Sequence, residues 1–280
     1  MRVDTHTHFY DPSRPEGVPW PPADNGSLYR TVLPEHHREL AQPHGITGTV
    51  VVEASAWLDD NQWILDLADD DPWLLGLIGH VDPGPEFVGG IDRFADHPKF
   101  LGIRLGGGLF DNVEQGSNVL DSAGQLAQRD LTLDVIVSGY RQIEGVADVA
   151  HRFPNLRIVI NHVAHVPIDG ETPDAGWLGA MAKAVSASNQ VYCKVSGLVE
   201  ASVQQPAPAD PEYYRPTLEA LMQVFGGDRL IYGSNWPVSD RAAPYETVVA
   251  AVEGFFTEQG DEGAEKLWWR NAFGAYRWPE

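Results

Sequence analysis

The chain has 280 residues, of which 43% are hydrophobic and 21% are charged, a composition typical of a folded globular protein and unlike that of a disordered one. Its 40 acidic residues exceed its 19 basic residues, which gives a formal net charge of −21 with histidine neutral. Because such a surface repels phosphate groups, we exclude nucleic acids and anionic membranes as partners and expect a small-molecule substrate.

The cysteine content and the first residues of the chain indicate the cellular compartment of the protein. The single cysteine, Cys193, excludes an intrachain disulfide and a cysteine-based metal cluster. The opening residues MRVDTHTHFY lack the apolar stretch of a secretory signal peptide, and no run of about 18 apolar residues occurs anywhere. We therefore expect a cytoplasmic protein, whose oligomeric state the sequence leaves open.

Eight short apolar runs recur along the chain. They show little polar alternation, which is typical of strands buried on both faces of a parallel sheet. The eight predicted strands are Arg2–Asp4, Thr47–Glu53, Leu74–His80, Phe100–Leu105, Leu131–Val137, Arg157–Asn161, Val191–Val195 and Arg229–Gly233.

The segments between these runs mostly have the apolar spacing of helices. Asn61–Asp70 has a broad apolar face, and Tyr213–Phe225 has apolar residues at helical spacing followed by the stop Gly226–Gly227. Residues 264–276 supply a last helix. Strands that alternate with helices predict a parallel sheet, and eight such units predict a closed (β/α)₈ barrel, the TIM barrel, as a single domain over residues 1–280.

An open, doubly wound α/β sheet is the alternative fold. It would usually have a glycine-rich phosphate-binding turn after the first strand, and none is present there. Residues 9–33 are rich in proline and follow the first strand, so we expect them to form an active-site loop over the carboxyl face of the barrel. Glu200–Pro211, after the seventh strand, is either a second lid or an ordinary surface loop.

The segment Asp4-Thr5-His6-Thr7-His8 at the end of the first strand is the sharpest chemical signal. Two residues apart on an extended chain, His6 and His8 project from the same side. A lone histidine is usually structural. A pair at the mouth of a barrel, however, indicates a functional site that binds one metal ion or one substrate oxygen.

Two further strand ends hold polar residues. The sixth strand ends in Asn161-His162-Val163-Ala164-His165, where His162 is placed to be a general base, an electrophile or a third ligand. We interpret His165 as a loop residue. The eighth strand ends in Ser234-Asn235-Trp236-Pro237, which places Asn235 at the mouth with Trp236 in the turn behind it.

Charged residues occur within or at the ends of other strands. Arg104 ends the fourth strand and precedes a run of glycines that lets a ligand approach the backbone. Lys194 lies inside an apolar strand, where a cation is costly unless it is paired or functional. We interpret it as a substrate-binding residue, with an internal ion pair to Asp134 or Glu53 as the alternative. Those two acids could each be a ligand, a base or a counter-ion.

Taken together, these motifs resemble the amidohydrolase superfamily, and within it the amidohydrolase-2 group of sugar-lactone hydrolases, including fuconolactone and rhamnonolactone hydrolases and pyrone-dicarboxylate lactonase. The likeness covers nearly the whole chain. It comprises D-x-H-x-H-F at 4–9, the P-W, Y-R and L-P-E pieces between 19 and 35, H-P-K-F-L-G-I-R at 97–104, V-Y-C-K-V-S-G-L at 191–198, R-L-I-Y-G-S-N-W-P-V at 229–238 and the closing N-A-F-G-A-Y-R.

The resemblance implies a (β/α)₈ barrel that opens a lactone ring by adding water to its carbonyl group. By position, His6 and His8 would polarise the carbonyl directly or through a metal, and His162 would assist polarisation or proton transfer. The remaining predicted substrate contacts are made by side chains that would hold hydroxyl or carboxylate groups: Arg104, Lys194, Asp134, Tyr140, Arg141 and Trp236.

The chain departs from the group's pattern at two places. Many relatives have G-S-D-W-P-V, whose aspartate deprotonates the attacking water, whereas this chain has Asn235, which is no base at neutral pH. Relatives often have D-H-x-G-x-P where this chain has N-H-V-A-H-V-P. Glu53, Asp240 and His162 are therefore the candidate bases. The alternatives to a lactonase are a barrel enzyme acting on another bond, such as an amide or a carboxylate lost as CO₂, and a non-catalytic sugar-acid-binding protein.

Members of the resembled group differ in metal use. The predicted fifth strand ends in Val137-Ser138 without a histidine, so a binuclear site of many histidines is not expected. We predict at most one divalent ion, zinc or manganese, held by His6, His8 and Glu53, with a metal-free site as the alternative.

Overall fold

A computed structural model describes residues 1–114 and 116–279. Eight parallel strands pair in chain order to form one sheet. They are β1 (Val3–Thr7), β2 (Gly48–Val52), β3 (Leu74–Gly79), β4 (Phe100–Gly106), β5 (Thr132–Ile136), β6 (Ile158–Ile160), β7 (Val191–Val195) and β8 (Leu230–Tyr232). Each predicted strand corresponds to one of these, and β1 extends to Thr7, so that His6 lies within the strand.

The first and last strands meet and close the sheet. The backbone N–H of His8 donates to the carbonyl of Trp236 at 2.9 Å, and the N–H of Asn235 donates to the carbonyl of His6, also at 2.9 Å. A single parallel bridge joins Thr7 to Trp236. The (β/α)₈ barrel expected from the eight strand–helix units is thereby confirmed.

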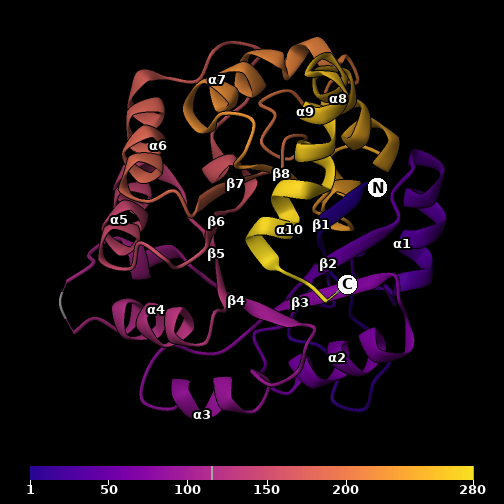
Figure 1. Cartoon of the computed structure of the whole chain (residues 1–280). Helices are drawn as coiled ribbons and strands as arrows, with labels where there is room; N and C mark the ends of the chain where they lie inside the picture. Colours follow the sequence, from indigo (N-terminus) through magenta and orange to yellow (C-terminus); the bar gives the residue numbers. More distant parts are fainter. Residues whose placement is uncertain (115, 280) are drawn as a thin grey trace.

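Helices surround the barrel (Figure 1). They are α1 (Pro34–Ala41), α2 (Asp60–Asp70), α3 (Phe87–Asp92), α4 (Asn118–Gln128), α5 (Gly139–Arg152), α6 (Ala175–Ala187), α7 (Arg215–Phe225), α8 (Tyr245–Glu258), α9 (Gly260–Glu265) and α10 (Asn271–Tyr276), with a π-helical turn over Lys266–Arg270 between the last two. The helix predicted over residues 264–276 is confirmed: α9, the π-helical turn and α10 follow one another without a break. None of the helices in the described ranges is long and apolar enough to cross a membrane.

Local sequence explains where several helices begin and end. The carboxylate of Asp174 accepts hydrogen bonds from the backbone N–H groups of Gly176 and Trp177, which caps α6 at its start. Gly226 follows α7 with a φ of +67°, a left-handed conformation that glycine adopts without steric cost. The predicted stop after Phe225 is confirmed.

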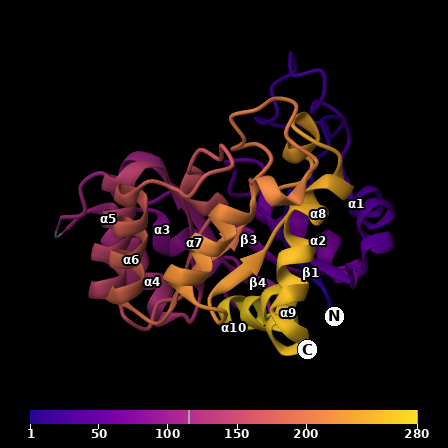
Figure 2. The same cartoon turned by 90° about the horizontal axis from the view of Figure 1, so that it is seen from above.

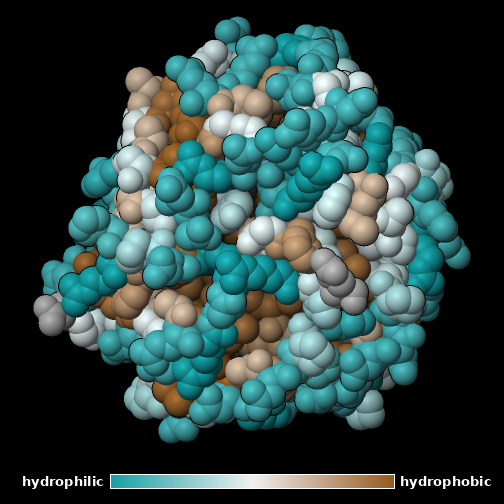
Figure 3. Space-filling model, viewed as in Figure 1, coloured by the Kyte–Doolittle hydropathy of each residue, from teal (hydrophilic) through white to brown (hydrophobic). Residues whose placement is uncertain are grey.

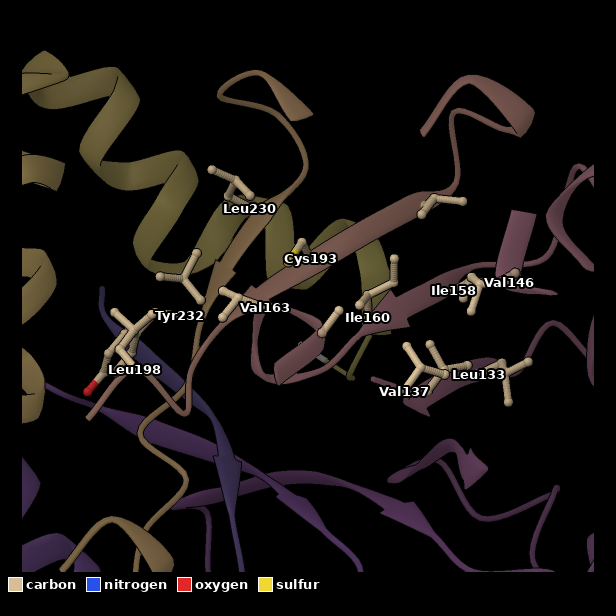
Figure 4. Packing of buried hydrophobic residues seen from close by; sticks show 14 of the residues in the cluster. Leu133, Val137, Val146, Ile158, Ile160, Val163, Cys193, Leu198, Leu230 and Tyr232 are labelled. Atoms are coloured by element: carbon tan, nitrogen blue, oxygen red, sulfur yellow. The ribbon is translucent and has the colours of Figure 1, made fainter. Parts of the chain in front are cut away.

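Two buried apolar layers stabilise the fold. The larger lies between the strands and the surrounding helices, and Figure 4 shows Leu133, Ile158 and Cys193 of neighbouring strands together with Val146 of α5 in this layer. Burial of each large aliphatic side chain contributes about 1.5–3 kcal/mol. The smaller layer fills the barrel interior, where Tyr276 packs near strand residues such as Val3.

Helix α10 covers the amino end of the barrel. Its residue Ala275 accepts hydrogen bonds through its carbonyl oxygen from Thr132 and Arg157, at the starts of β5 and β6. The face shown in Figure 3, which has α10 toward the viewer, is largely hydrophilic with hydrophobic side chains visible between the helices. In Figure 2 the loops after β1 and β7 rise together at the opposite end, away from both termini. A ligand therefore has access from the carboxyl end.

Candidate active site

The carboxyl end of the barrel contains a cavity of about 740 Å³, within the range of small-molecule sites. Most of the lining residues lie at or directly after the carboxyl ends of the strands, where TIM barrels have their active sites. The lining residues are His8, Pro19, Trp20, Glu53, Ala54, Ala56, Arg104, Ile136, His162, His165, Gly197, Glu200, Ala201, Asn235, Val238 and Arg241.

Three imidazole rings cluster at the carboxyl end of the barrel: His8 and His162 line the cavity, and His6, which is fully buried and is not one of the lining residues, packs against both. The ring of His6 lies 5.0 Å from that of His8 and 4.3 Å from that of His162, measured between centroids. All three side chains are buried. Burial lowers the pKa of each histidine, to about 3 for His8, and neighbouring positive groups lower it further. The three imidazoles are therefore neutral at physiological pH.

Lys194 determines which nitrogen of His6 holds the proton. Its Nζ lies 2.8 Å from Asp134 Oδ2, 2.9 Å from the carbonyl oxygen of Thr5 and 3.2 Å from His6 Nδ1. An ammonium group has three donors and no acceptor, so these three contacts match its three N–H bonds. Nδ1 of His6 then accepts, and the proton lies on Nε2. That Nε2 is buried without a hydrogen-bond partner among the described residues.

His8 and Asn235 form the next part of the site. Nδ1 of His8 is 3.0 Å from the carbonyl oxygen of Val52, to which it must donate. Nε2 of His8 lies 3.2 Å from Oδ1 of Asn235. Because the proton of neutral His8 is on Nδ1, both of these atoms are acceptors, and the pair is a contact and not a hydrogen bond. The other end of the Asn235 side-chain amide donates to Glu200 Oε1 at 2.6 Å. One amide thus connects an imidazole to a carboxyl group in the wall of the pocket.

Backbone conformation at these strand ends is unusual. His162, Val163, Ala164 and His165 all have φ between 46° and 54°, and Asn235 has φ of 60°, a left-handed region that is costly for residues with a Cβ and is concentrated at functional sites. Gly197, at φ +67°, faces this turn, and a Cβ there would lie 2.9 Å from His162 Cβ. Glycine at 197 is required for the ring of His162 to occupy its place.

Arg104 and Glu53 form an ion pair in the pocket wall. Nε and Nη2 of Arg104 donate to Glu53 Oε1 at 2.9 and 2.8 Å, and Nη2 also donates to the backbone carbonyl oxygen of Glu53 at 3.0 Å. The predicted substrate contact Arg104 therefore lines the cavity. The predicted metal ligand Glu53 also lines it, with one carboxylate oxygen engaged by the guanidinium.

Other predicted site residues lie outside the cavity wall. Lys194 and Asp134 are fully buried and pair with each other below the imidazoles, the arrangement that the sequence offered as the alternative to substrate binding. Trp236 is buried, with its ring 6.3 Å from that of Phe9. Tyr140 and Arg141, in the first turn of α5, are exposed at the surface. Direct substrate contact by these five residues stays a prediction.

Tyr140 and Arg141 make surface contacts instead. The hydroxyl of Tyr140 donates to Asp174 at 2.5 Å, and Nε of Arg141 donates to the carbonyl oxygen of Asp111 at 2.6 Å. Asp134 is held more deeply, since Asn161 and Tyr276 also donate to its carboxylate.

Two charged groups of the pocket, Glu200 and Arg241, were not predicted from the sequence as site residues. Glu200 was noted only as the start of a possible lid, although an acid at the end of the apolar stretch 195–199 was a usable signal. Asp4 was also missed as a structural residue: its carboxylate accepts from His37, Tyr245 and the backbone N–H of Ser234, which ties β1 to β8.

A resident divalent ion does not fit the side chains as they are placed. Among the described residues, no group of three or more His, Cys, Asp or Glu side chains is arranged to share an ion, whereas protein zinc sites usually have at least three such ligands. His6 presents an N–H at Nε2, and a metal requires a lone pair there. Glu53 is paired with Arg104.

Comparison with known proteins places the chain in a family. The family model described as amidohydrolase matches residues 3–278. The L-fucono-1,5-lactonase of Burkholderia ambifaria is 33% identical over 88% of this chain and 83% of its own length. The L-fucono-1,5-lactonase of Burkholderia multivorans is 30% identical, over 100% of this chain and 97% of its own.

A solved structure agrees with these relatives. The crystal structure of an amidohydrolase from Burkholderia multivorans with bound zinc superimposes with a TM-score of 0.85 at 26% identity and covers 100% of both chains. The match extends over the whole barrel, including the strand ends that form the imidazole pocket. The chain therefore belongs to the amidohydrolase family and is a hydrolase.

Proposed function

We propose that this chain hydrolyses a sugar lactone, an aldono-1,5-lactone of the L-fucono type or a close relative, by adding water to the ring carbonyl. The observation that carries the proposal is the cluster of neutral imidazoles, in which His6 packs against the cavity-lining His8 and His162 and has an N–H without a partner among the described residues. The names of the two Burkholderia relatives support this substrate class.

The imidazole cluster supplies electrophilic assistance. As water adds, negative charge develops on the carbonyl oxygen, and buried N–H donors that are fixed in advance stabilise that charge. His6 Nε2–H is such a donor, and the buried Lys194 behind it holds the proton on the correct nitrogen. His162, whose ring lies against that of His6, is the second group placed to contact the carbonyl.

The rest of the pocket suits a polyhydroxylated ring. Arg104 presents guanidinium N–H groups at the wall, and Arg241 adds a second cation, so both are placed to hold hydroxyl groups and the carboxylate formed on ring opening. The ring of Trp20 lies 5.8 Å from that of His8 and offers an apolar face to the sugar. The reaction as proposed uses only these side chains and water.

A screen of lactones tests the proposal. Acid release is followed with a pH indicator over aldono-1,5-lactones, aldono-1,4-lactones and dicarboxylate lactones, each corrected for spontaneous hydrolysis. We expect turnover of at least one aldono-1,5-lactone, with the same rate before and after chelator treatment. Correctly folded protein that hydrolyses none of these lactones, or that only releases CO₂ from a carboxylate, would contradict the proposal.

A further inference from the structure

We propose that Glu200 is the catalytic base that removes a proton from the attacking water, in place of the aspartate that Asn235 replaces after β8. This inference rests on the proposed lactone hydrolysis and assigns the group that the sequence left open between Glu53, Asp240 and His162.

The position of Glu200 supports this role. It follows β7 by five residues and lines the cavity together with His8, His162 and Asn235. Its Oε1 accepts the 2.6 Å hydrogen bond from Asn235. Its Oε2 is buried and has no hydrogen-bond partner in the described part of the chain. A carboxyl group with one oxygen fixed and the other available is arranged to accept a proton from a bound water.

Asn235 connects this carboxyl group to the imidazoles. The same amide that donates to Glu200 lies 3.2 Å from His8 Nε2, so Glu200 is one side chain away from the cluster that binds the carbonyl oxygen. A water held beside the carbonyl carbon is therefore within reach of Oε2. Asn235 acts as a positioning residue in this arrangement.

The surroundings of Glu200 tune its proton affinity. Burial raises the pKa of Glu200 to about 7, opposed by the hydrogen bond from Asn235 and by the positive charge of Arg241, while Asp240 acts in the same direction as burial. Tyr214 also faces the carboxyl group from the start of α7. A base whose pKa lies near the working pH is the most efficient proton acceptor.

The other acids near the pocket are engaged with cations. Glu53 accepts two hydrogen bonds from Arg104, and Asp240 pairs with Arg30 at 3.1 Å. Both carboxylates are thus occupied by a guanidinium, whereas Oε2 of Glu200 has no partner in the described part of the chain. Of the two carboxyl side chains that line the cavity, Glu53 is in an ion pair and Glu200 forms none with any described residue.

The step balances without any further reactant. An O–H bond of water breaks and its proton passes to Oε2 of Glu200 as the water oxygen bonds to the carbonyl carbon. The bond between that carbon and the ring oxygen then breaks. Its electron pair goes to the ring oxygen, which takes the proton back from Glu200. The product is the open-chain hydroxy acid, which ionises in solvent.

Glu200→Gln tests the assignment, because glutamine keeps the size and the contact to Asn235 but accepts no proton. We expect kcat to fall by about 10²-fold or more, with KM changed by less than about threefold. The wild-type kcat should rise with pH with a midpoint near 7, and this rise should vanish in the variant. Glu212→Gln, an exposed change three residues before the start of α7, is the matched control and should behave as wild type.

A double variant separates a catalytic role from a structural one. Glu200→Gln combined with Asn235→Asp returns a carboxylate to β8, and we expect it to recover at least about tenfold of the lost kcat. An active wild type with no rise near pH 7, or a Glu200→Gln variant within threefold of wild type, overturns the assignment but leaves the lactonase proposal standing. A wild type that turns over no lactone overturns both.

Discussion

At the scale of single residues, the buried side chains that contact the imidazoles are as important to the site as the imidazoles themselves. Lys194 is a fully buried cation whose three donors are all used, by Asp134, the carbonyl of Thr5 and His6. Asp134 in turn is bound by several donors, including the hydroxyl of Tyr276. This buried pair stabilises the barrel interior and fixes the tautomer of His6 with the same contacts.

Lys194→Met tests that double role. Removing one partner of a buried pair leaves an uncompensated charge, and we expect a loss of about 3–5 kcal/mol in the free energy of unfolding. Activity should fall as well, because His6 Nε2 no longer reliably holds the proton. The control is Lys183→Met, whose exposed pair with Glu144 spans 3.3 Å and should change stability by less than about 1 kcal/mol. Equal urea-unfolding free energies for the two variants would contradict this account.

At the scale of elements, the loop after β1 forms one wall of the pocket. Tyr10 and Val32 pair across its base, Arg30 joins it to Asp240, and Pro19 and Trp20 line the cavity. A segment fixed at its base and pressed against the opening is suited to bind the substrate ring and exclude water.

Trp20→Ala should weaken substrate binding more than chemistry. The lost aromatic contact is worth about 1 kcal/mol or somewhat more, so KM should rise roughly five- to tenfold while kcat changes little. Tyr29→Ala, an exposed position on the same loop that does not line the cavity, is the control. Steady-state kinetics on the best lactone give both values. A fall in kcat with unchanged KM would show that the loop acts on the chemical step.

The strands and helices could be predicted from local sequence patterns. The barrel that they form then predicts which residues at strand ends meet at the site. Parallel strands bring their carboxyl ends to one edge, so His8, Glu53, Arg104, His162 and Asn235 line one cavity although they are distant in the chain.

The remaining placements depend on tertiary contacts that no local pattern records. Lys194 was predictable as a buried cation, but whether it faces a ligand or Asp134 depends on which residues lie at the same level of the barrel. Glu200 follows its strand through an irregular turn, so its direction depends on packing against Asn235. Tyr140 and Arg141 were assigned by resemblance, and in the structure they lie on the outer surface of α5.

At the scale of the whole molecule, the buried site makes stability depend on pH. The pKa values of His6, His8 and His162 are lowered on folding, so each binds a proton more readily when the chain is unfolded. Their stabilising contribution is fully present above pH 6.5 and is lost as the pH falls. Glu200, whose pKa is raised on folding, acts in the opposite direction between about pH 4.3 and 7.

The net effect is testable by urea unfolding at several pH values. Three histidines less one glutamate leave about two protons taken up on unfolding near pH 5, so stability should fall with decreasing pH and reach a slope of about 3 kcal/mol per pH unit there. His162→Asn should reduce that slope by about one proton. Stability that is constant or rises over this range would mean that the histidines are not buried and neutral in solution.

If the imidazole cluster hydrolyses a lactone, wild type and His6→Phe, both treated with chelator, should differ in the rate of acid release from L-fucono-1,5-lactone. We expect wild type to exceed spontaneous hydrolysis clearly, and the variant, which keeps a ring but lacks the N–H, to be slower by about 10²–10³-fold. A wild-type rate equal to that of buffer, or a variant as fast as wild type, would contradict the account.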